Sequence, residues 1–181
     1  MRIIAGRFRS RLLKSVSGLA VRPTPDRLRE AMFNVLSGEV EGRTFLDAYA
    51  GSGAVGLEAL SRGARHVILI EKSPAALAVI RENVQALHVR AEVTVLRGSA
   101  ARLLETHTAD IAFVDPPYEQ VTQYSTSLLA LSNTGCKLVV AQHPSRLTLD
   151  DAYGFLERRR VLRQGDNSLS LYAAMRDSAS E

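Results

Sequence analysis

Two stretches of the chain hold residues whose types and spacing could bind a ligand and act on it. The first, residues 45–56, reads FLDAYAGSGAVG and leads from an apolar run into a glycine-rich turn. Glycine lets a backbone turn tightly and approach a ligand closely, because it has no Cβ atom. The spacing Gly51-x-Gly53-x-x-Gly56 matches the dinucleotide fingerprint, and Glu71 follows at about 20 residues, where an acid would meet ribose hydroxyls.

Asp47 makes the ligand of this turn ambiguous. It precedes Gly51 by four residues and lies at the carboxyl end of the expected strand. A carboxylate there attracts a cationic ammonium group and repels an anionic pyrophosphate. The glycine turn alone therefore does not identify its ligand.

The second stretch is Asp115-Pro116-Pro117-Tyr118. Its two prolines remove two N–H donors and fix two φ angles, so the neighbouring carbonyl groups need donors from elsewhere. The amino group of a nucleobase is such a donor: Asp115 and the Pro116 carbonyl could accept its hydrogens while Tyr118 stacks on the ring. The alternative is an acid and a Pro-Pro turn that only end a strand.

The elements that must position these residues alternate between strand and helix from residue 43 to residue 142. Apolar runs at 66–71, 91–97, 109–115 and 137–142 predict strands, and helical patterns separate them. This alternation predicts an α/β, doubly wound, mostly parallel sheet with its ligand cleft at the carboxyl ends of the strands. Asp47, Glu71, Ser99 and Asp115 all stand at such ends. Residues 155–163 and 168–175 predict an antiparallel hairpin at the sheet edge.

The beginning of the chain is basic. Residues 1–30 hold eight Lys and Arg residues against two acids, although the whole chain of 181 residues has a net charge of only +4. Runs at 2–4 and 11–13 predict a small hairpin, and Thr24 and Pro25 predict the start of a helix that continues to about Ser37. The concentrated charge favours binding to a polyanion such as RNA, and a solvated basic face is the alternative. We divide the chain into a basic extension (1–38), a main domain (39–176) and a tail (177–181).

Other kinds of site find little support. The single cysteine, Cys136, adjoins an expected strand and is predicted to be a packed thiol. The four histidines show no metal-ligand spacing and are expected at the surface or at strand ends, so no metal site is predicted. No apolar run approaches the roughly 18 residues of a membrane span, so we expect a cytoplasmic protein that binds no membrane.

Three blocks together resemble one enzyme family. They are residues 22–34 (RPTPDRLREAMFN), residues 50–64 (AGSGAVGLEALSRGA) and Asp115–Tyr118, and Arg2–Gly6 agrees as well. In this order they resemble the bacterial 16S ribosomal RNA guanine-N2 methyltransferases, which use S-adenosylmethionine. The resemblance extends over nearly the whole chain. It implies a seven-stranded Rossmann-like methyltransferase sheet with a C-terminal antiparallel hairpin, preceded by a small basic N-terminal hairpin and helix.

The resemblance also implies a role for each matching residue. The catalytic residues would be Asp115, Pro116, Pro117 and Tyr118. The residues binding S-adenosylmethionine would be Asp47, Ala48, Gly51, Ser52, Gly53, Glu71, Lys72, Gly98, Ser99, Ala100 and Asp115. The RNA-binding residues would be Arg7, Arg9, Arg11, Arg22 and Arg27. The implied partner is 16S rRNA or the assembling small ribosomal subunit, and the implied state is a monomer.

Two departures from the family pattern and three rival functions stay open. Ser99 stands where relatives often carry an acid or amide for the adenine, and Gln142-His143 stands where they often carry Glu-His. Methylation of adenine N6 in DNA or RNA is the nearest rival, because the Asp-Pro-Pro-Tyr turn recognises an amine and not one base. A nicotinamide-dependent oxidoreductase and a non-catalytic RNA-binding module are the other rivals.

Overall fold

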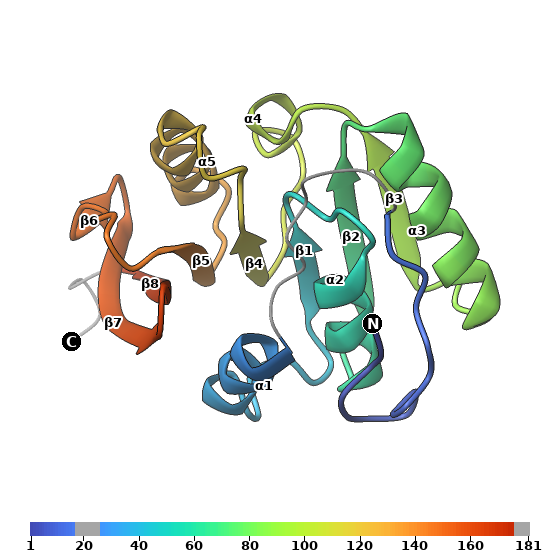
Figure 1. The fold of residues 1–181 in the computed structure, drawn as a ribbon. Helices are drawn as coiled ribbons and strands as arrows, with labels where there is room; N and C mark the ends of the chain where they lie inside the picture. Colours follow the sequence, from blue (N-terminus) through green and yellow to red (C-terminus); the bar gives the residue numbers. More distant parts are fainter. Residues whose placement is uncertain (17–25, 176–181) are drawn as a thin grey trace.

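Eight strands form a single mixed sheet in the order β3-β2-β1-β4-β5-β8-β7-β6 (Figure 1). The computed structural model describes residues 1–16 and 26–175 of the chain. The strands are β1 (Thr44–Asp47), β2 (His66–Glu71), β3 (Val93–Arg97), β4 (Ile111–Val114), β5 (Leu138–Pro144), β6 (Ala152–Tyr153), β7 (Leu156–Gln164) and β8 (Asn167–Ala174). The helices are α1 (Asp26–Val35), α2 (Ala54–Ser61), α3 (Pro74–Ala86), α4 (Ala100–Leu103) and α5 (Thr122–Ser132).

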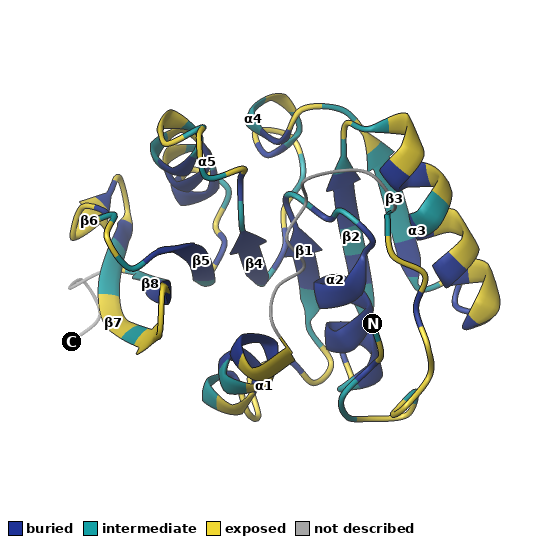
Figure 2. Cartoon of the chain, viewed as in Figure 1, coloured by how far each residue is buried: buried dark blue, intermediate teal, exposed yellow. Residues whose placement is uncertain are grey.

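The central parallel strands β1, β4 and β5 are almost wholly buried, as their apolar sequences predict, whereas the edge strand β3 is mostly half-buried. Strands β1 to β5 run parallel, and the strand order reverses at β1, which pairs with both β2 and β4. Successive side chains of a strand point to opposite faces, so Phe45 joins one apolar cluster and Leu46 the other. Helices α1, α2 and α3 contribute to the first cluster, and α4 and α5 to the second (Figure 2).

The predicted C-terminal hairpin is present, but the predicted count of seven strands is wrong. Strand β8 pairs antiparallel with β5, and β7 pairs with β8. The eighth strand is the two-residue β6, which pairs with the first residues of β7 through Ala152↔Glu157 and Tyr153↔Leu156. This short strand therefore forms the edge of the sheet. It lies in the segment LTLDDAYG, for which the sequence analysis predicts no strand.

The N-terminal arm, which we define as residues 1–16, folds back on itself beside α2 and α3 (Figure 1). Its expected strands reduce to one antiparallel bridge, Arg2↔Leu12, supported by hydrogen bonds from Ile3 N to Arg11 O (3.0 Å) and from Ser10 N to Ile3 O (2.9 Å). Gly6 allows the close approach of the arm to α2. Its φ angle is +81°, and a Cβ atom there would lie 1.8 Å from the carbonyl oxygen of Ser61.

Helix α1 follows the arm. It ends at Val35, two residues before the predicted end at Ser37. The predicted start at Thr24 and Pro25, the predicted RNA contact Arg22 and the tail 177–181 lie outside the described residues. Within the described ranges, no helix has the length and apolar character needed to cross a membrane.

Candidate functional site

The carboxyl ends of β1, β2, β3 and β4 border a cleft of about 380 Å³. Ligands of doubly wound folds bind where the strand order reverses, and this volume is within the usual range for small-molecule sites. The predicted residues on its walls are Asp47, Ala48, Gly51, Ser52, Glu71, Lys72, Gly98, Ser99, Ala100, Asp115, Pro116, Pro117 and Tyr118. The structure therefore brings the glycine turn and the Asp-Pro-Pro-Tyr turn to one site.

The glycine turn between β1 and α2 requires glycine at several positions. Gly51 and Gly53 have φ angles of 55° and 80°, a region that other residues rarely adopt. A Cβ atom on Gly56 would lie 2.3 Å from Leu69 Cδ2 of β2, so this glycine allows α2 to pack closely on the sheet. Gly53 itself does not line the cleft; it shapes the turn immediately before α2.

Glu71 holds the glycine turn to the end of β2. Its Oε2 accepts a hydrogen bond from Gly51 N at 2.8 Å, and its Oε1 accepts bonds from Lys72 N and Ser73 N, each at 2.8 Å. Three backbone donors thus fix a carboxylate that lines the cleft. Ser73 also caps α3, because its hydroxyl accepts from Ala76 N at 3.4 Å.

Asp47 is buried at the end of β1, with only 1% of its surface exposed. Its Oδ2 accepts a hydrogen bond from Gly56 N at 3.2 Å, whereas its Oδ1 has no hydrogen-bond partner within residues 1–16 and 26–175. Burial raises the pKa of this carboxyl to about 7, against smaller opposing effects of backbone hydrogen bonds. A cation in the cleft would stabilise its charged form.

The Asp-Pro-Pro-Tyr turn leaves the sheet directly after β4. Asp115 is half-buried and Pro116 is buried. The Tyr118 hydroxyl donates to Asn167 Oδ1 at 2.6 Å, which connects the turn to β8. Sequence reasoning assigned Tyr118 a stacking role and did not foresee this contact with the hairpin.

Further cleft residues escaped sequence reasoning. Met1, Tyr49, Gln123 and Gln142 all line the cleft. The Tyr49 hydroxyl bonds Gln123 Oε1 at 3.1 Å and Ser127 Oγ at 2.8 Å. Of these, Gln142 was noted in the sequence only as a departure from the family pattern; the structure places it directly after the last register pair of β4 and β5, Val114↔Ala141.

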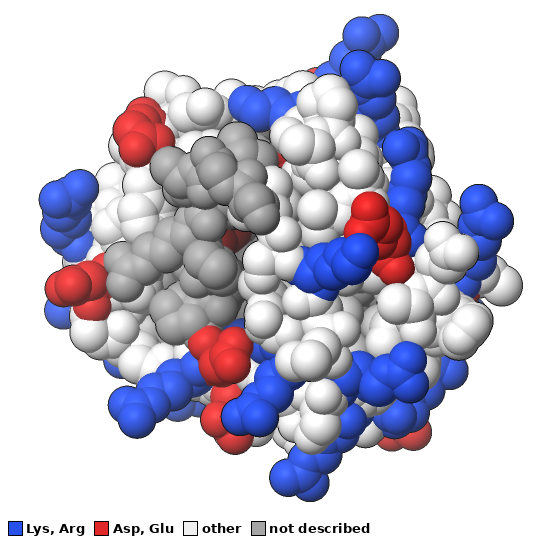
Figure 3. Space-filling model, turned by 45° about the vertical axis from the view of Figure 1, so that its right-hand side comes forward, with Lys and Arg blue, Asp and Glu red and all other residues white. Residues whose placement is uncertain are grey.

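The predicted RNA-binding arginines that the structure describes, Arg7, Arg9, Arg11 and Arg27, do not line the cleft. Arg7 pairs with Glu92 at 2.5 Å, and Arg11 donates to the Ala86 carbonyl of α3 at 2.9 Å. Arg9 and Arg27 are exposed. On the face shown in Figure 3, Lys and Arg side chains surround the margin and gather most densely along the lower edge.

Buried polar side chains attach the arm to the main sheet. Glu58 of α2 accepts hydrogen bonds from Ile4 N (2.8 Å) and Ala5 N (3.1 Å) of the arm. Asn83 of α3 accepts from Lys14 N (2.8 Å) and donates to Lys14 O (3.1 Å) and to Ser52 O (3.0 Å). Because Ser52 belongs to the glycine turn, Asn83 links the arm to the wall of the cleft.

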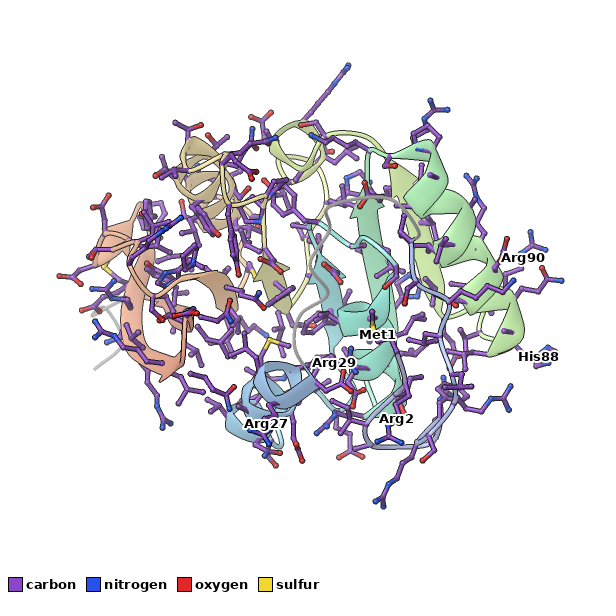
Figure 4. The ribbon with its side chains drawn as sticks, in the orientation of Figure 1. Met1, Arg2, Arg27, Arg29, His88 and Arg90 are labelled. Atoms are coloured by element: carbon purple, nitrogen blue, oxygen red, sulfur yellow. The ribbon has the colours of Figure 1, made fainter. Side chains whose placement is uncertain are left out.

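Arg29 is a structural arginine, although it contributes to the basic charge of residues 1–30. Arg29 and Arg27 both belong to helix α1 (Figure 4). Its side chain is buried, its Nη2 donates to Arg2 O at 2.6 Å, and its Nε lies 3.8 Å from Glu58 Oε2. Burial lowers the pKa of this guanidinium, and Glu58 and Asp26 oppose that effect.

Cys136 and His143 are both buried side chains. Cys136 is buried, as expected, and burial raises the pKa of its thiol to about 12. His143 stands near the end of β5 but is only 3% exposed, with Nε2 2.8 Å from Ser170 Oγ. The described residues contain no group of three or more His, Cys, Asp or Glu side chains that could hold a metal ion.

The similar proteins and the similar solved structure described below are all named as methyltransferases. The family described as Conserved hypothetical protein 95 matches residues 1–173. "Putative rRNA methyltransferase YlbH" of Bacillus subtilis is 34% identical over 95% of this chain and 98% of its own length. "Ribosomal RNA small subunit methyltransferase D" of Haemophilus influenzae is 34% identical over 74% of this chain and 72% of its own. The solved structure "Putative methyltransferase yhhF from Escherichia coli" superimposes with a TM-score of 0.84 at 32% identity, covering 96% of this chain and 97% of that one.

Proposed function

The chain belongs to the family described as Conserved hypothetical protein 95, and from that membership we propose that it methylates the exocyclic N2 amine of a guanine in 16S ribosomal RNA. It is an rRNA methyltransferase, as its relatives are named, and it depends on S-adenosylmethionine. The target nucleotide and the roles of individual residues are parts of the proposal. So are a cytoplasmic location and action as a monomer.

One observation supports this function above the others: the glycine turn and the Asp-Pro-Pro-Tyr turn open into the same cleft. A methyl donor and an amine must meet in line within one enclosed space, since the protein's main task is alignment. A nicotinamide-dependent oxidoreductase would need no such amine-binding turn beside its glycine loop. The described part of the chain also forms one sheet without a second, substrate-binding sheet.

The residues present fit S-adenosylmethionine. The glycine turn gives close access to backbone atoms, and the unmatched Oδ1 of Asp47 suits a cationic methionine portion. Glu71 would receive the ribose hydroxyls, and Gly98, Ser99 and Ala100 would border the adenine. The three backbone bonds of Glu71 leave about one acceptor site, on Oε2, because a carboxylate offers about two lone-pair sites on each oxygen and Oε1 already accepts two bonds.

Asp115 and Pro116 would orient the reacting amine. When bound, S-adenosylmethionine supplies a methyl group already activated by its sulfonium. The lone pair of the guanine amine is delocalised into the ring, so acceptors on its two hydrogens help to direct that lone pair towards the methyl group. Asp115 accepts one hydrogen and the Pro116 carbonyl accepts the other. Tyr118 stacks on the target base once that base has left its stack in the RNA. The proton lost from nitrogen passes to Asp115 or to water.

RNA would contact the arm and its neighbourhood. Arg7, Arg9, Arg11 and Arg27 lie on or beside the arm, where exposed guanidinium groups can pair with phosphates. His88 and Arg90 project outwards from the connection between α3 and β3, on the same side as the arm (Figure 4). The division into a basic extension (1–38) and a methyltransferase domain (39–176) belongs to this proposal.

The function is tested by transfer from S-adenosylmethionine labelled in its methyl group. Substrates are small-subunit RNA and small subunits from cells that lack the modification, followed by mapping of the labelled base. We expect label at N2 of one guanine. Label at an adenine N6 would support the rival amino methyltransferase, and binding of nicotinamide dinucleotide without transfer would overturn the proposal.

Asp115→Ala provides the matched variant for this assay. It should lower kcat by at least about 100-fold, on the scale of losing one preorganised transition-state contact. Cofactor affinity should change little, because the glycine turn and Glu71 remain. Near-wild-type transfer by this variant would remove Asp115 from the mechanism.

A further inference from the structure

Gln142 has an unmatched acceptor and lies in the wall of the candidate site. It is only 2% exposed, it lines the cleft, and its Oε1 has no hydrogen-bond partner in the described part of the chain. A buried amide oxygen without a donor costs stability, so such a group calls for an explanation. A ligand with an N–H group that enters the cleft would provide the missing donor.

The sheet register places Gln142 beside the amine-binding turn. Strands β4 and β5 pair in parallel, and their last register pair is Val114↔Ala141. The next residues along the two strands are Asp115 and Gln142, and neighbouring residues in a parallel register point to the same face. Gln142 also pairs with Leu169 of β8, which holds its backbone from the other side. Its position is therefore fixed by two neighbouring strands.

A third acceptor beside Asp115 and Pro116 would distinguish the two candidate bases. The reacting amine of guanine carries two hydrogens, and the adjacent ring nitrogen N1 carries a third donor on the same edge. Adenine has an amine but no hydrogen on its N1. A site built to accept a particular N–H group strongly rejects an analogue that lacks it, because a buried acceptor is then left unpaired.

We propose that Gln142 is a specificity-determining residue whose side-chain oxygen accepts the N1–H of the target guanine. This inference rests on the proposed function and adds a reason why the enzyme takes guanine and not adenine. Asp115 and the Pro116 carbonyl hold the amine, and Gln142 reads the adjacent ring position. The free protein bears the cost of an unmatched oxygen, and substrate binding removes it.

Two variants distinguish the effect of the acceptor oxygen of Gln142 from the effect of its side-chain volume. Gln142→Met keeps a similar length without a polar group, and Gln142→Glu keeps an acceptor oxygen. We expect Gln142→Met to lower kcat/KM for guanine by about 10- to 100-fold, and Gln142→Glu to recover a large part of that loss. Gln142→Met should fold with equal or higher thermal stability, because it removes an unmatched buried oxygen. The exposed Gln164 of β7 supplies the control variant Gln164→Met, expected to act like wild type.

The decisive measurement replaces the target guanine by 2-aminopurine in an RNA assembled with a synthetic fragment. This base keeps the 2-amino group but has no hydrogen on N1. The wild-type protein should methylate it about 10- to 100-fold less efficiently than guanine, whereas Gln142→Met should treat the two bases within a few-fold. Such a cycle isolates the contact between Gln142 and N1–H.

Each outcome decides between the claims. If the wild type methylates guanine and Gln142→Met shows the same preference for guanine over 2-aminopurine, the inference fails while the proposed function stands. A lower activity of Gln142→Glu than of Gln142→Met would also overturn it, because the amide would then act as a donor. Absence of guanine methylation by the wild type would instead reject the proposed function.

Discussion

The attachment of the arm and the wall of the cleft use buried polar groups in opposite ways. Under the arm, Glu58 and Asn83 together make five hydrogen bonds to backbone atoms of the arm and the glycine turn. In the cleft, the Oδ1 of Asp47 and the Oε1 of Gln142 have no partner among the residues that the structure describes. The two regions do not differ in burial, since all four side chains are at most 2% exposed.

This difference separates architecture from binding. Buried polar groups that are matched within the chain fix one arrangement, whereas an unmatched group on the wall of a cleft can be satisfied by a ligand. Beside the arm, Arg29 also leaves its Nε and Nη1 unmatched among the described residues, but there the carboxylates of Glu58 and Asp26 lie within 4 Å of the guanidinium. We therefore expect the arm to be ordered in the free protein and the cleft to be completed by its ligands. The following predictions concern variants that remove a matched contact or an unmatched polar group.

The largest effect should follow Glu58→Ala. This change removes the acceptor for Ile4 N and Ala5 N and the partner of Arg62, which bonds Glu58 Oε1 at 2.7 Å. It also removes one of the two carboxylates beside the buried Arg29, while Asp26 stays at 3.0 Å. Breaking a buried pair completely costs about 3–5 kcal/mol, which is the upper bound for this part of the loss. Urea unfolding should therefore show a much lower midpoint than for the exposed control Glu105→Ala. A midpoint equal to that of the control would show that the arm does not depend on Glu58.

The variant Asp47→Asn tests the unmatched carboxyl in the cleft through the pH dependence of protein stability. The pKa of Asp47 is raised from 3.8 to about 7 by burial, so the folded protein holds a proton that the unfolded chain has lost. Wild-type stability should therefore fall as pH rises from 4 to 7, and Asp47→Asn should lack this part of the loss. Thermal unfolding at several pH values measures it.

Asp110 provides a control carboxyl whose pKa is shifted in the opposite direction to that of Asp47. A hydrogen bond from Thr44 N lowers the pKa of its carboxyl, with Lys137 adding to the effect. Its contribution is present at neutral pH and is lost as pH falls through the folded pKa, so Asp110→Asn should reduce the acid-side loss. Parallel pH profiles for wild type and Asp47→Asn would contradict a buried, protonated Asp47.

Particular residues show how far the sequence leads. Local patterns were sufficient for the parallel strands and for Glu71 and Asp115, because apolar runs that end in an acid predict both a strand and its ligand-facing end. They could not reveal that Glu58 and Asn83 bind the arm, since their partners are 54 and 69 residues away. Strand β6 was missed because pairing with β7, and not its own composition, makes it a strand.

Asn83→Ala should have an intermediate effect on both regions at once. It removes the hydrogen bonds to Lys14 and leaves the carbonyl of Ser52 without its donor. We expect a loss of about 1–3 kcal/mol in the free energy of unfolding. Binding of S-adenosylmethionine, measured by calorimetry, should weaken, because Ser52 lies on the cleft wall.

The control for this variant is Gln85→Ala, an exposed position on the same helix. It should leave both quantities close to those of wild type. If Asn83→Ala lowers stability but leaves cofactor affinity unchanged, the link between the arm and the glycine turn has no role in cofactor binding. Asn83 would then belong to the architecture alone.

The smallest effect on stability should come from Arg9→Ala at the exposed surface of the arm. Surface substitutions usually change the free energy of unfolding by less than about 0.5 kcal/mol, and Arg9 is exposed. If Arg9 contacts a phosphate, its loss should weaken RNA binding and reduce the salt slope by about one charge. Fluorescence anisotropy at several salt concentrations measures both. Since the matched groups beneath the arm stay intact, cofactor affinity should not change, and an unchanged salt slope would place the RNA elsewhere on the surface.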